Sequence, residues 1–290
     1  MSARKRWAAC MDSARRGART LVMGVLNVTP DSFSDGGRYF ALEKAVEHAI
    51  EMTNAGADIL DIGGESTRPA TFASNRPLPA EEELRRILPV VEALRVHLPD
   101  MPLSVDTYKA EVAQAALERG VVLINDISAL RADAQMASVA QRFDAWVCLM
   151  HMPGLPTALP SAPHYEDVVH EVVEHLRERV KSAETAGIAP NRILIDPGIG
   201  FGKTPAQNLE LLRRLPELLQ LGYPLLVGTS RKSFIGKVLG GLPPEERLEG
   251  TAATVALAIA GGAHVVRVHD VKAMVRVVRM TDAIVRGWPG

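Results

Sequence analysis

The sequence predicts an α/β protein of the (β/α)8 TIM-barrel class, and three observations support this prediction. The chain has 290 residues, which is near the usual length of one such barrel. Hydrophobic residues make up 47% of it and aromatic residues only 4%, so its core must be mainly aliphatic. Short β-branched runs alternate with longer helical patterns from about Leu21 to the end. Because no long linker interrupts the alternation, a closed barrel is favoured over an open sheet.

Eight short apolar runs are the expected strands, and each ends in a polar or glycine-rich segment. They are Leu21–Val28, Asp58–Ile62, Leu103–Val105, Val121–Asn125, Ala145–Met150, Arg192–Asp196, Pro224–Gly228 and His264–Val268. Apolar residues at three- and four-residue spacing predict the helices between them. These are Leu42–Ala55, Ala80–His97, Ala110–Arg119, Tyr165–Ala186, Ala206–Leu215, Pro244–Ala260 and Val271–Arg286. The longest irregular stretches, Thr29–Phe40 and Gly63–Pro79, are the expected binding loops.

Residues 1–20 are expected to form a loose basic leader ahead of a single barrel domain at residues 21–290. Six Lys and Arg side chains lie within the first 19 residues, which lack the continuous apolar segment of a secretory signal. An organelle transit peptide has a similar arginine-rich composition and stays open as an alternative.

Composition and charge exclude several classes of function. The 33 Lys and Arg residues nearly balance the 34 Asp and Glu residues, so no overall field favours nucleic acid or an anionic membrane. No stretch is apolar and long enough to span a membrane. The only cysteines, Cys10 and Cys148, show no paired spacing for zinc or a disulfide framework. A reducing cytoplasm is the expected location.

A polar residue stands at or just after the end of each predicted strand. These residues are Asn27, Asp61, Asp106, Asn125, His151, Asp196, Lys232 and the pair Arg267 and His269. In a barrel the carboxyl ends of the strands converge at one mouth, where the chemistry of this fold gathers. Any single Asp or Asn could instead cap the next helix, and Asp106 is the plainest example. Asn125 and Asp196 lie within apolar runs, where a buried polar group needs a partner such as a ligand.

The last predicted strand places two potential cations on one face. Arg267 and His269 are two residues apart, so the period of a strand directs both side chains the same way. With Lys232 they could form a basic cluster suited to a phosphate or diphosphate. For His269 alone, a satisfied and partly buried histidine is an equal alternative.

The segment Pro197–Thr204 tests a different phosphate-binding hypothesis. Gly202, Lys203 and Thr204 match the end of an NTPase phosphate loop, but Pro197 occupies the position where that motif requires glycine. We interpret the segment as a glycine-rich loop whose backbone approaches a flat ligand. The sequence also lacks the zinc peptidase, serine hydrolase and EF-hand motifs.

Eight short blocks carry a resemblance to a known family. They are Met23–Gly37, Leu60–Pro69, Ser104–Thr107, Asn125–Ile127, Leu149–Met152, Asp196–Lys203, Ser230–Ser233 and Arg267–His269. In this order they resemble the signatures of dihydropteroate synthases, and the likeness covers roughly Leu21 to Ile284. Ala129-Leu130, Pro153 and the stretch Ala70–Pro79 depart mildly from the family pattern, which affects the shape of loops.

The resemblance implies three groups of substrate-binding residues. Those implied for the pterin are Asp106, Asn125, Asp196 and Lys232. Those implied for the diphosphate are Arg267, His269 and Asn27, the last also through Mg²⁺, a hard ion that commonly bridges phosphate oxygens. Those implied near the aminobenzoate are Thr67, Arg68, Phe201, Lys232 and Ser233.

The resemblance also implies a reaction, in which 6-hydroxymethyl-7,8-dihydropterin diphosphate and 4-aminobenzoate give 7,8-dihydropteroate and diphosphate in folate biosynthesis. The implied catalytic residues are Lys232, Arg267, His269, Asp106 and Asp196. A homodimer and competition by sulfonamides are further expectations. Two alternatives remain: a barrel that binds methyltetrahydrofolate for methyl transfer, and a pterin-binding barrel without catalysis, because fold does not fix function.

Overall fold

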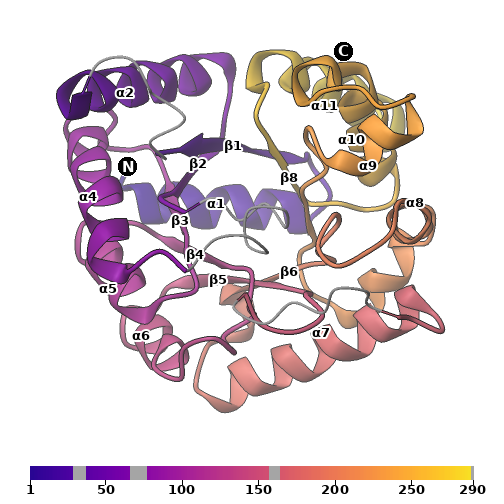
Figure 1. Cartoon of the computed structure of the whole chain (residues 1–290), viewed down its shortest axis with the longest axis horizontal. Helices are drawn as coiled ribbons and strands as arrows, with labels where there is room; N and C mark the ends of the chain where they lie inside the picture. The colour runs from indigo at the N-terminus through magenta and orange to yellow at the C-terminus, as the bar shows by residue number, and fades with distance from the viewer. Residues whose placement is uncertain (29–36, 66–76, 157–163, 289–290) are drawn as a thin grey trace.

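The computed structural model describes residues 1–28, 37–65, 77–156 and 164–288. Eight strands form one sheet in the order β6-β5-β4-β3-β2-β1-β8-β7, and all the pairings between them are parallel. A parallel bridge between Ile195 and Leu225 joins the two ends of this order. The strands therefore curve into a nearly closed barrel surrounded by helices (Figure 1), as the sequence predicts.

The strands are short and lie within two residues of the expected positions at every boundary. They are β1 Leu21–Asn27, β2 Ile59–Gly63, β3 Leu103–Asp106, β4 Leu123–Asp126, β5 Trp146–Met150, β6 Ile193–Asp196, β7 Leu226–Val227 and β8 Val265–Val268. The outer helices are α2 Gly37–Ala55, α4 Ala80–His97, α5 Ala110–Glu118, α6 Met136–Arg142, α7 Val168–Thr185, α8 Pro205–Arg213, α9 Ser233–Val238, α10 Leu248–Ala260 and α11 Val271–Arg286. Short 3-10 helices cover Pro190–Arg192, Leu215–Leu221 and Pro244–Glu246.

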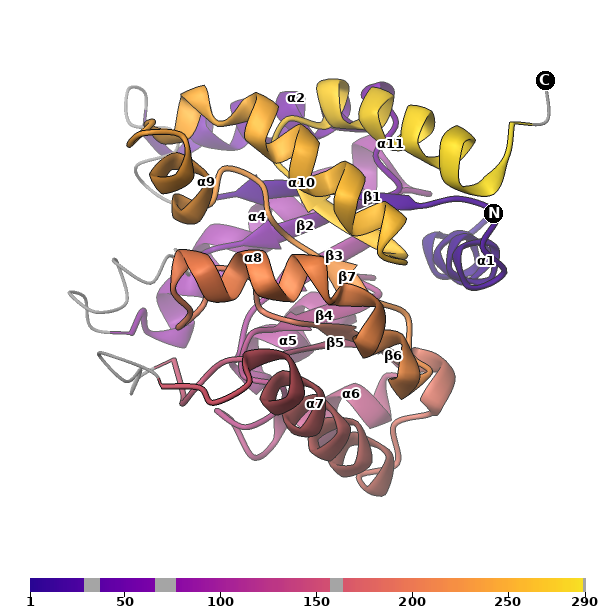
Figure 2. The ribbon, with the colours of Figure 1, turned by 90° about the vertical axis from the view of Figure 1, so that its right-hand side faces the viewer.

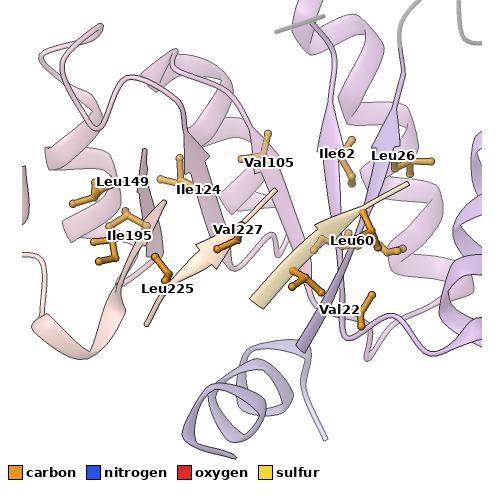
Figure 3. Packing of buried hydrophobic residues seen from close by; sticks show 14 of the residues in the cluster. Val22, Leu26, Leu60, Ile62, Val105, Ile124, Leu149, Ile195, Leu225 and Val227 are labelled. Atoms are coloured by element: carbon orange, nitrogen blue, oxygen red, sulfur yellow. The ribbon is translucent and has the colours of Figure 1, made fainter. Parts of the chain in front are cut away.

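The strands place alternate side chains in two separate apolar layers. On β1, Val22 and Leu26 belong to the large cluster between the sheet and the helices, together with residues such as Leu60 and Val227 (Figure 3). Leu21 and Met23 on the same strand belong to a second cluster inside the barrel. Because both faces of every strand are buried, the strands read as continuous apolar runs in the sequence.

The expectation of a loose leader at residues 1–20 is wrong. Residues Ala3–Arg15 form helix α1, which lies across one end of the barrel (Figures 1 and 2). Trp7 and Met11 are fully buried in the inner cluster, and Trp7 packs edge-on against Trp146 at a centroid distance of 6.2 Å. Because this amphipathic helix buries its apolar residues in the inner cluster, it is held against the barrel in spite of its basic residues.

Helices α6 and α9 were not among the predicted elements, because they have only seven and six residues. Helix α2 begins at Gly37, so the last part of the expected loop Thr29–Phe40 is helical. The remainder of that loop and much of Gly63–Pro79 lie outside the described residues. Within the described residues, no helix is both apolar enough and long enough to cross a membrane.

Candidate functional site

Polar side chains meet at the carboxyl ends of the first four strands. The parallel register pairs Asn27 with Gly63, Gly63 with Asp106, and Asp106 with Asn125. These residues therefore form one row across β1 to β4 at the mouth of the barrel. Gly63 leaves room in this row, since a Cβ there would lie 3.7 Å from Oδ1 of Asn27 and 3.8 Å from Oδ2 of Asp106.

A buried ion-pair network extends from this row into the barrel. Nε of Arg267 donates to Oδ2 of Asp61 at 2.6 Å, and Nη2 donates to Oδ2 of Asp106 at 2.7 Å. Nδ2 of Asn125 donates to the same oxygen of Asp61 at 3.0 Å. Although burial opposes its charged form, the two carboxylates raise the pKa of Arg267 further above its usual value. Arg267 therefore stays cationic.

The two carboxylates of this network retain unused hydrogen-bonding capacity. Burial raises the pKa of Asp106, and the guanidinium of Arg267 opposes part of this effect. Oδ1 of Asp61 and Oδ1 of Asp106 are buried and have no hydrogen-bond partner among the described residues. Since buried acceptors without partners are costly, Oδ1 of Asp106, at the end of its strand, is suited to accept a hydrogen bond from a bound ligand.

Asp106 does not cap the following helix, so the alternative explanation for this residue is wrong. Helix α5 begins after Lys109, which makes no side-chain capping bond, and the Ala110 amide instead donates to Oδ2 of Asp133 at 2.9 Å. Asp106 points into the barrel, where its partner Arg267 is 161 residues away in the sequence. Local sequence patterns could not reveal that pairing.

On the opposite side of the mouth, Lys232 lies against the loop between β6 and α8. Its Nζ donates to the carbonyl oxygen of Ile199 and lies 4.4 Å from the centroid of the Phe201 ring. Burial lowers the pKa of Lys232 to about 8, and Asp196 opposes this shift. Gly200 permits the approach, because a Cβ there would lie 2.5 Å from Cδ of Lys232.

Asp196 belongs to the same part of the mouth. Its side chain accepts a hydrogen bond from the Gly198 amide at 2.7 Å, and burial raises its pKa while Lys232 lowers it. Asp196 pairs in register with Met150 at the end of β5. Met150 and Phe201 belong to a small apolar cluster at the mouth, which supplies nonpolar side chains beside the charged groups.

The three residues of the predicted basic cluster each contact different partners within the protein. Arg267 is directed toward Asp61 and Asp106, whereas Nδ1 of His269 lies 3.0 Å from Oγ of Ser230. Ser233 is the first residue of the short helix α9, directly after Lys232. Thr67 and Arg68, predicted near the aminobenzoate, lie outside the described residues.

Three site contacts were not anticipated from the sequence. Asp61 stood among the strand-end residues but in none of the implied ligand groups, although it joins Arg267 to Asn125. The Ile199 carbonyl and the Ser230 hydroxyl hold Lys232 and His269. The available signal for Asp61 was its place between Leu60 and Ile62 in the apolar run of β2, since a fully buried carboxylate needs partners.

A cavity of about 370 Å³ lies at the opposite end of the barrel, near the start of β1. Most of its charged lining is already paired, because Arg19 binds both carboxylate oxygens of Asp58, and Asp282 accepts from the Thr20 amide. The catalytic groups of barrels lie at the carboxyl ends of the strands. We therefore assign the site to the mouth that holds Arg267 and Lys232.

Comparison with known proteins identifies the family. The profile of the family described as pterin binding enzyme matches residues 23–269. A dihydropteroate synthase of Bacillus subtilis is 49% identical over 266 residues, which are 92% of this chain and 89% of the relative. The enzyme of the same name from Escherichia coli is 47% identical over 262 residues, 90% of each chain. The chain belongs to the dihydropteroate synthase family of pterin-binding enzymes.

Solved dihydropteroate synthases share this fold closely. A crystal structure from Clostridium difficile, obtained in the presence of pteroic acid, superposes with a TM-score of 0.86 at 49% identity, covering 93% of this chain and 98% of that one. The Xanthomonas albilineans enzyme with 4-aminobenzoic acid gives a TM-score of 0.86 at 48% identity, covering 94% and 95%. The resemblance to dihydropteroate synthases seen in the sequence is therefore confirmed.

Proposed function

We infer that this chain catalyses the dihydropteroate synthase reaction of folate biosynthesis. The observation that carries the inference is the buried network of Arg267 with Asp61 and Asp106, which faces Lys232 at the mouth of a barrel of this family. Homologous structures with pteroic acid, 4-aminobenzoic acid and 7,8-dihydropteroate support the same substrates. The methyl-transfer alternative has no comparable support among these relatives.

The acceptors of the mouth match the donors along the guanidine-like edge of a pterin. Asp106 and Asp196 offer carboxylate oxygens, and the carbonyl of the Asn125 amide adds a further acceptor. Oδ1 of Asp106, which has no partner among the described residues, would gain one from the pterin. The polar residues within apolar strands are thus explained as a pterin-binding set.

The diphosphate would lie beside Arg267, His269 and Asn27. The two carboxylates use two of the five N–H donors of Arg267, so the guanidinium can hold them and still donate to phosphate oxygens. Charge develops on the leaving diphosphate as the C–O bond breaks. A fixed cation and a histidine placed there before the reaction stabilise that charge without reorganisation.

In the reaction, the aniline nitrogen of 4-aminobenzoate forms a bond to the pterin methylene carbon. The C–O bond breaks, diphosphate leaves with the electron pair, and the nitrogen loses a proton. Because the nucleophile is weak and the leaving group is good, early C–O cleavage to a delocalised pterin cation is favoured. Asp106 and Asp196 would stabilise this cation, while Lys232, Phe201 and Ser233, with Thr67 and Arg68, would orient the aminobenzoate.

Mg²⁺ is proposed as the cofactor. Oδ1 of Asn27 lies beside Gly63 and near Asp106, and oxygen donors of this kind suit a hard ion that keeps several waters. An ion at Asn27 would supply positive charge to the leaving diphosphate. Among the described residues there is no group of three acidic, histidine or cysteine side chains that could hold an ion alone, so phosphate oxygens would complete its ligands.

A homodimer is proposed for the assembly, and the cytoplasm stays the predicted location. Large apolar side chains are exposed on the neighbouring helices α10 and α11 and after α11. Leu257 is 61% exposed, Met280 62%, Ile284 71% and Trp288 79%. Such a concentration on adjacent helices exceeds the scattered apolar residues of an ordinary surface and is typical of a protein interface.

The proposal is tested by incubating the purified protein with Mg²⁺, 6-hydroxymethyl-7,8-dihydropterin diphosphate and radiolabelled 4-aminobenzoate. We expect labelled dihydropteroate from the wild type, and none from folded Lys232→Ala or Arg267→Ala or when metal is omitted. Near-normal turnover in either variant would remove that residue from catalysis. Absence of product from wild-type protein that still binds pterin would favour the noncatalytic barrel.

A further inference from the structure

Lys203 ends the glycine-rich segment between β6 and α8, and its ammonium group joins that segment to the end of β5. Nζ donates to the carbonyl oxygens of Gly198 at 3.0 Å and of Phe201 at 3.1 Å. The same atom lies 2.9 Å from Nδ1 of His151, the residue after β5. An ammonium group has three N–H donors, and these three acceptors use all of them.

The histidine is suited to accept this bond. Burial lowers the pKa of His151 well below its usual value, and Lys203 lowers it further, so its imidazole is neutral near pH 7. A neutral ring that carries its proton on Nε2 offers Nδ1 as an acceptor. His175 of α7, with its ring centroid 4.8 Å away, and Arg131 are the other basic groups that face His151.

The backbone of this segment is held closely on both sides. Gly198 has a φ of +65°, and a Cβ there would lie 1.9 Å from the carbonyl oxygen of His151, so the backbone touches the end of β5 directly. On the other side, the Gly200 amide donates to Oδ1 of Asn208 in α8 at 2.6 Å. Lys203 supplies the side-chain attachment to β5, and Asn208 supplies the attachment to α8.

The fixed segment carries two contacts of Lys232, namely the Ile199 carbonyl and the Phe201 ring. We propose that Lys203 is a positioning residue, which fixes the backbone of residues 198–201 and thereby sets the place of the Lys232 ammonium group and the Phe201 ring. The consequence for turnover rests on the proposed function, whereas the structural role of Lys203 does not. Lys203 is distinct from a phosphate ligand, because its three donors are used within the protein.

The charge of Lys203 is part of this role. Burial lowers its pKa to about 7; Asp196 opposes this shift, and Lys232 adds to it. Loss of the proton leaves two N–H donors for three acceptors, so the attachment weakens as the pH rises through that value. An arginine at this position would keep its charge but place its donors in a flat fork, which cannot match the same three acceptors.

The test is amide hydrogen exchange of the full-length Lys203→Met variant, followed by mass spectrometry. Since charged hydrogen bonds protect local structure, we expect exchange in residues 198–202 to rise about 10-fold, with no change in peptides from β1. Lys203→Arg should restore part of the protection. The matched control is Lys237→Met, an exposed lysine in α9, which should behave as the wild type.

Steady-state kinetics supply the second readout. If Lys203 positions Phe201 and Lys232, the KM for 4-aminobenzoate rises about 10-fold in Lys203→Met, whereas it stays unchanged in Lys237→Met. Unchanged exchange in residues 198–202 would overturn the proposal, as would a uniform rise across the whole chain. If Lys203→Met does not fold, His151→Leu replaces it, because this variant removes one of the three acceptors of Lys203. Exchange in residues 198–202 is then measured in His151→Leu, and a local rise or its absence decides in the same way.

These outcomes also separate the two proposals. Wild-type protein without synthase activity, combined with a local rise of exchange in Lys203→Met, would remove the proposed function and leave the positioning role of Lys203 intact. Wild-type synthase activity combined with unchanged exchange in Lys203→Met would support the proposed function and remove the positioning role of Lys203.

Discussion

At the scale of single residues, Asp61 illustrates how one buried carboxylate organises two site residues. Its Oδ2 accepts from both Arg267 and Asn125, which the proposal assigns to the diphosphate and the pterin. Arg267 lies on β8 and Asn125 lies on β4, so no local interaction could align them. Asp61 acts through these neighbours and is a positioning residue.

Replacing Asp61 with Asn should test that role. The change keeps the shape and removes the charge, so Arg267 loses one of its two carboxylate partners. Because a charge-assisted hydrogen bond contributes about 1.5–3 kcal/mol, we expect kcat/KM to fall about 10- to 100-fold. The measurement is steady-state turnover with circular dichroism as a check of folding. Asp100→Asn, at a largely exposed aspartate, should leave kcat/KM unchanged.

A second residue-scale prediction concerns acid stability. Burial lowers the pKa of His175 to about 4, and Arg131 and Arg179 add to the shift. The unfolded chain therefore binds a proton near pH 6.5 that the folded chain takes up only near pH 4. The free energy of unfolding should fall as the pH drops through this window.

Urea unfolding at pH 7.5 and pH 5.0 measures that loss. The loss should be smaller in His175→Gln, since the glutamine does not titrate. His48→Gln, at an exposed histidine of α2, is the matched control. An equal loss in His175→Gln and in the wild type would mean that other groups cause the acid sensitivity.

At the scale of elements, helix α1 closes one end of the barrel. Trp7, Met11 and Ala14 are buried in the inner cluster, and Arg4 donates to the carbonyl oxygens of Phe143 and Asp144 beside β5. The helix thus fills the barrel interior at the end opposite the mouth. The polar network occupies the mouth itself. Its contribution is to stability, because it lies away from Arg267 and Lys232.

Trp7→Ala should therefore destabilise the protein without removing activity. Deleting a fully buried tryptophan costs about 3–5 kcal/mol through lost contacts and the cavity left behind. Chemical denaturation measures the free energy of unfolding, and turnover at low temperature measures activity. Trp288→Ala, at a tryptophan that is 79% exposed, should change stability by less than about 0.5 kcal/mol. A loss in Trp7→Ala as small as that expected for Trp288→Ala would show that Trp7 does not anchor α1 to the barrel.

At the scale of the whole molecule, the exposed apolar side chains of α10 and α11 predict association. We expect sedimentation velocity to show a dimer at micromolar concentration, and Leu257→Glu to shift it toward the monomer. The charge would otherwise be buried against an apolar partner surface. Val96→Glu, at an equally apolar and 77% exposed position of α4, should leave the dimer unchanged. A monomeric wild type would contradict the proposal.

The sequence by itself determined the barrel and most of the residues at its mouth. Its eight apolar runs are buried on both faces, so each appears as a strand irrespective of its partners. The polar residues at their ends meet at the mouth because all the strands are parallel. Helices α6 and α9 were not predicted, because they are too short to show a helical pattern of apolar residues. Helix α1 was not predicted, because its many basic residues masked its apolar positions.

Only the tertiary structure decided which polar groups pair. Arg267 meets Asp61 across 206 residues, and Lys203 meets His151 across 52, so neither contact follows from local spacing. The role of Asp106 was likewise decided by the tertiary structure. Asp133 accepts the hydrogen bond from the Ala110 amide at the start of α5, which leaves Asp106 to enter the barrel. A strand's pattern is set by burial of its own side chains, whereas a polar contact at the mouth is set by the closure of the barrel.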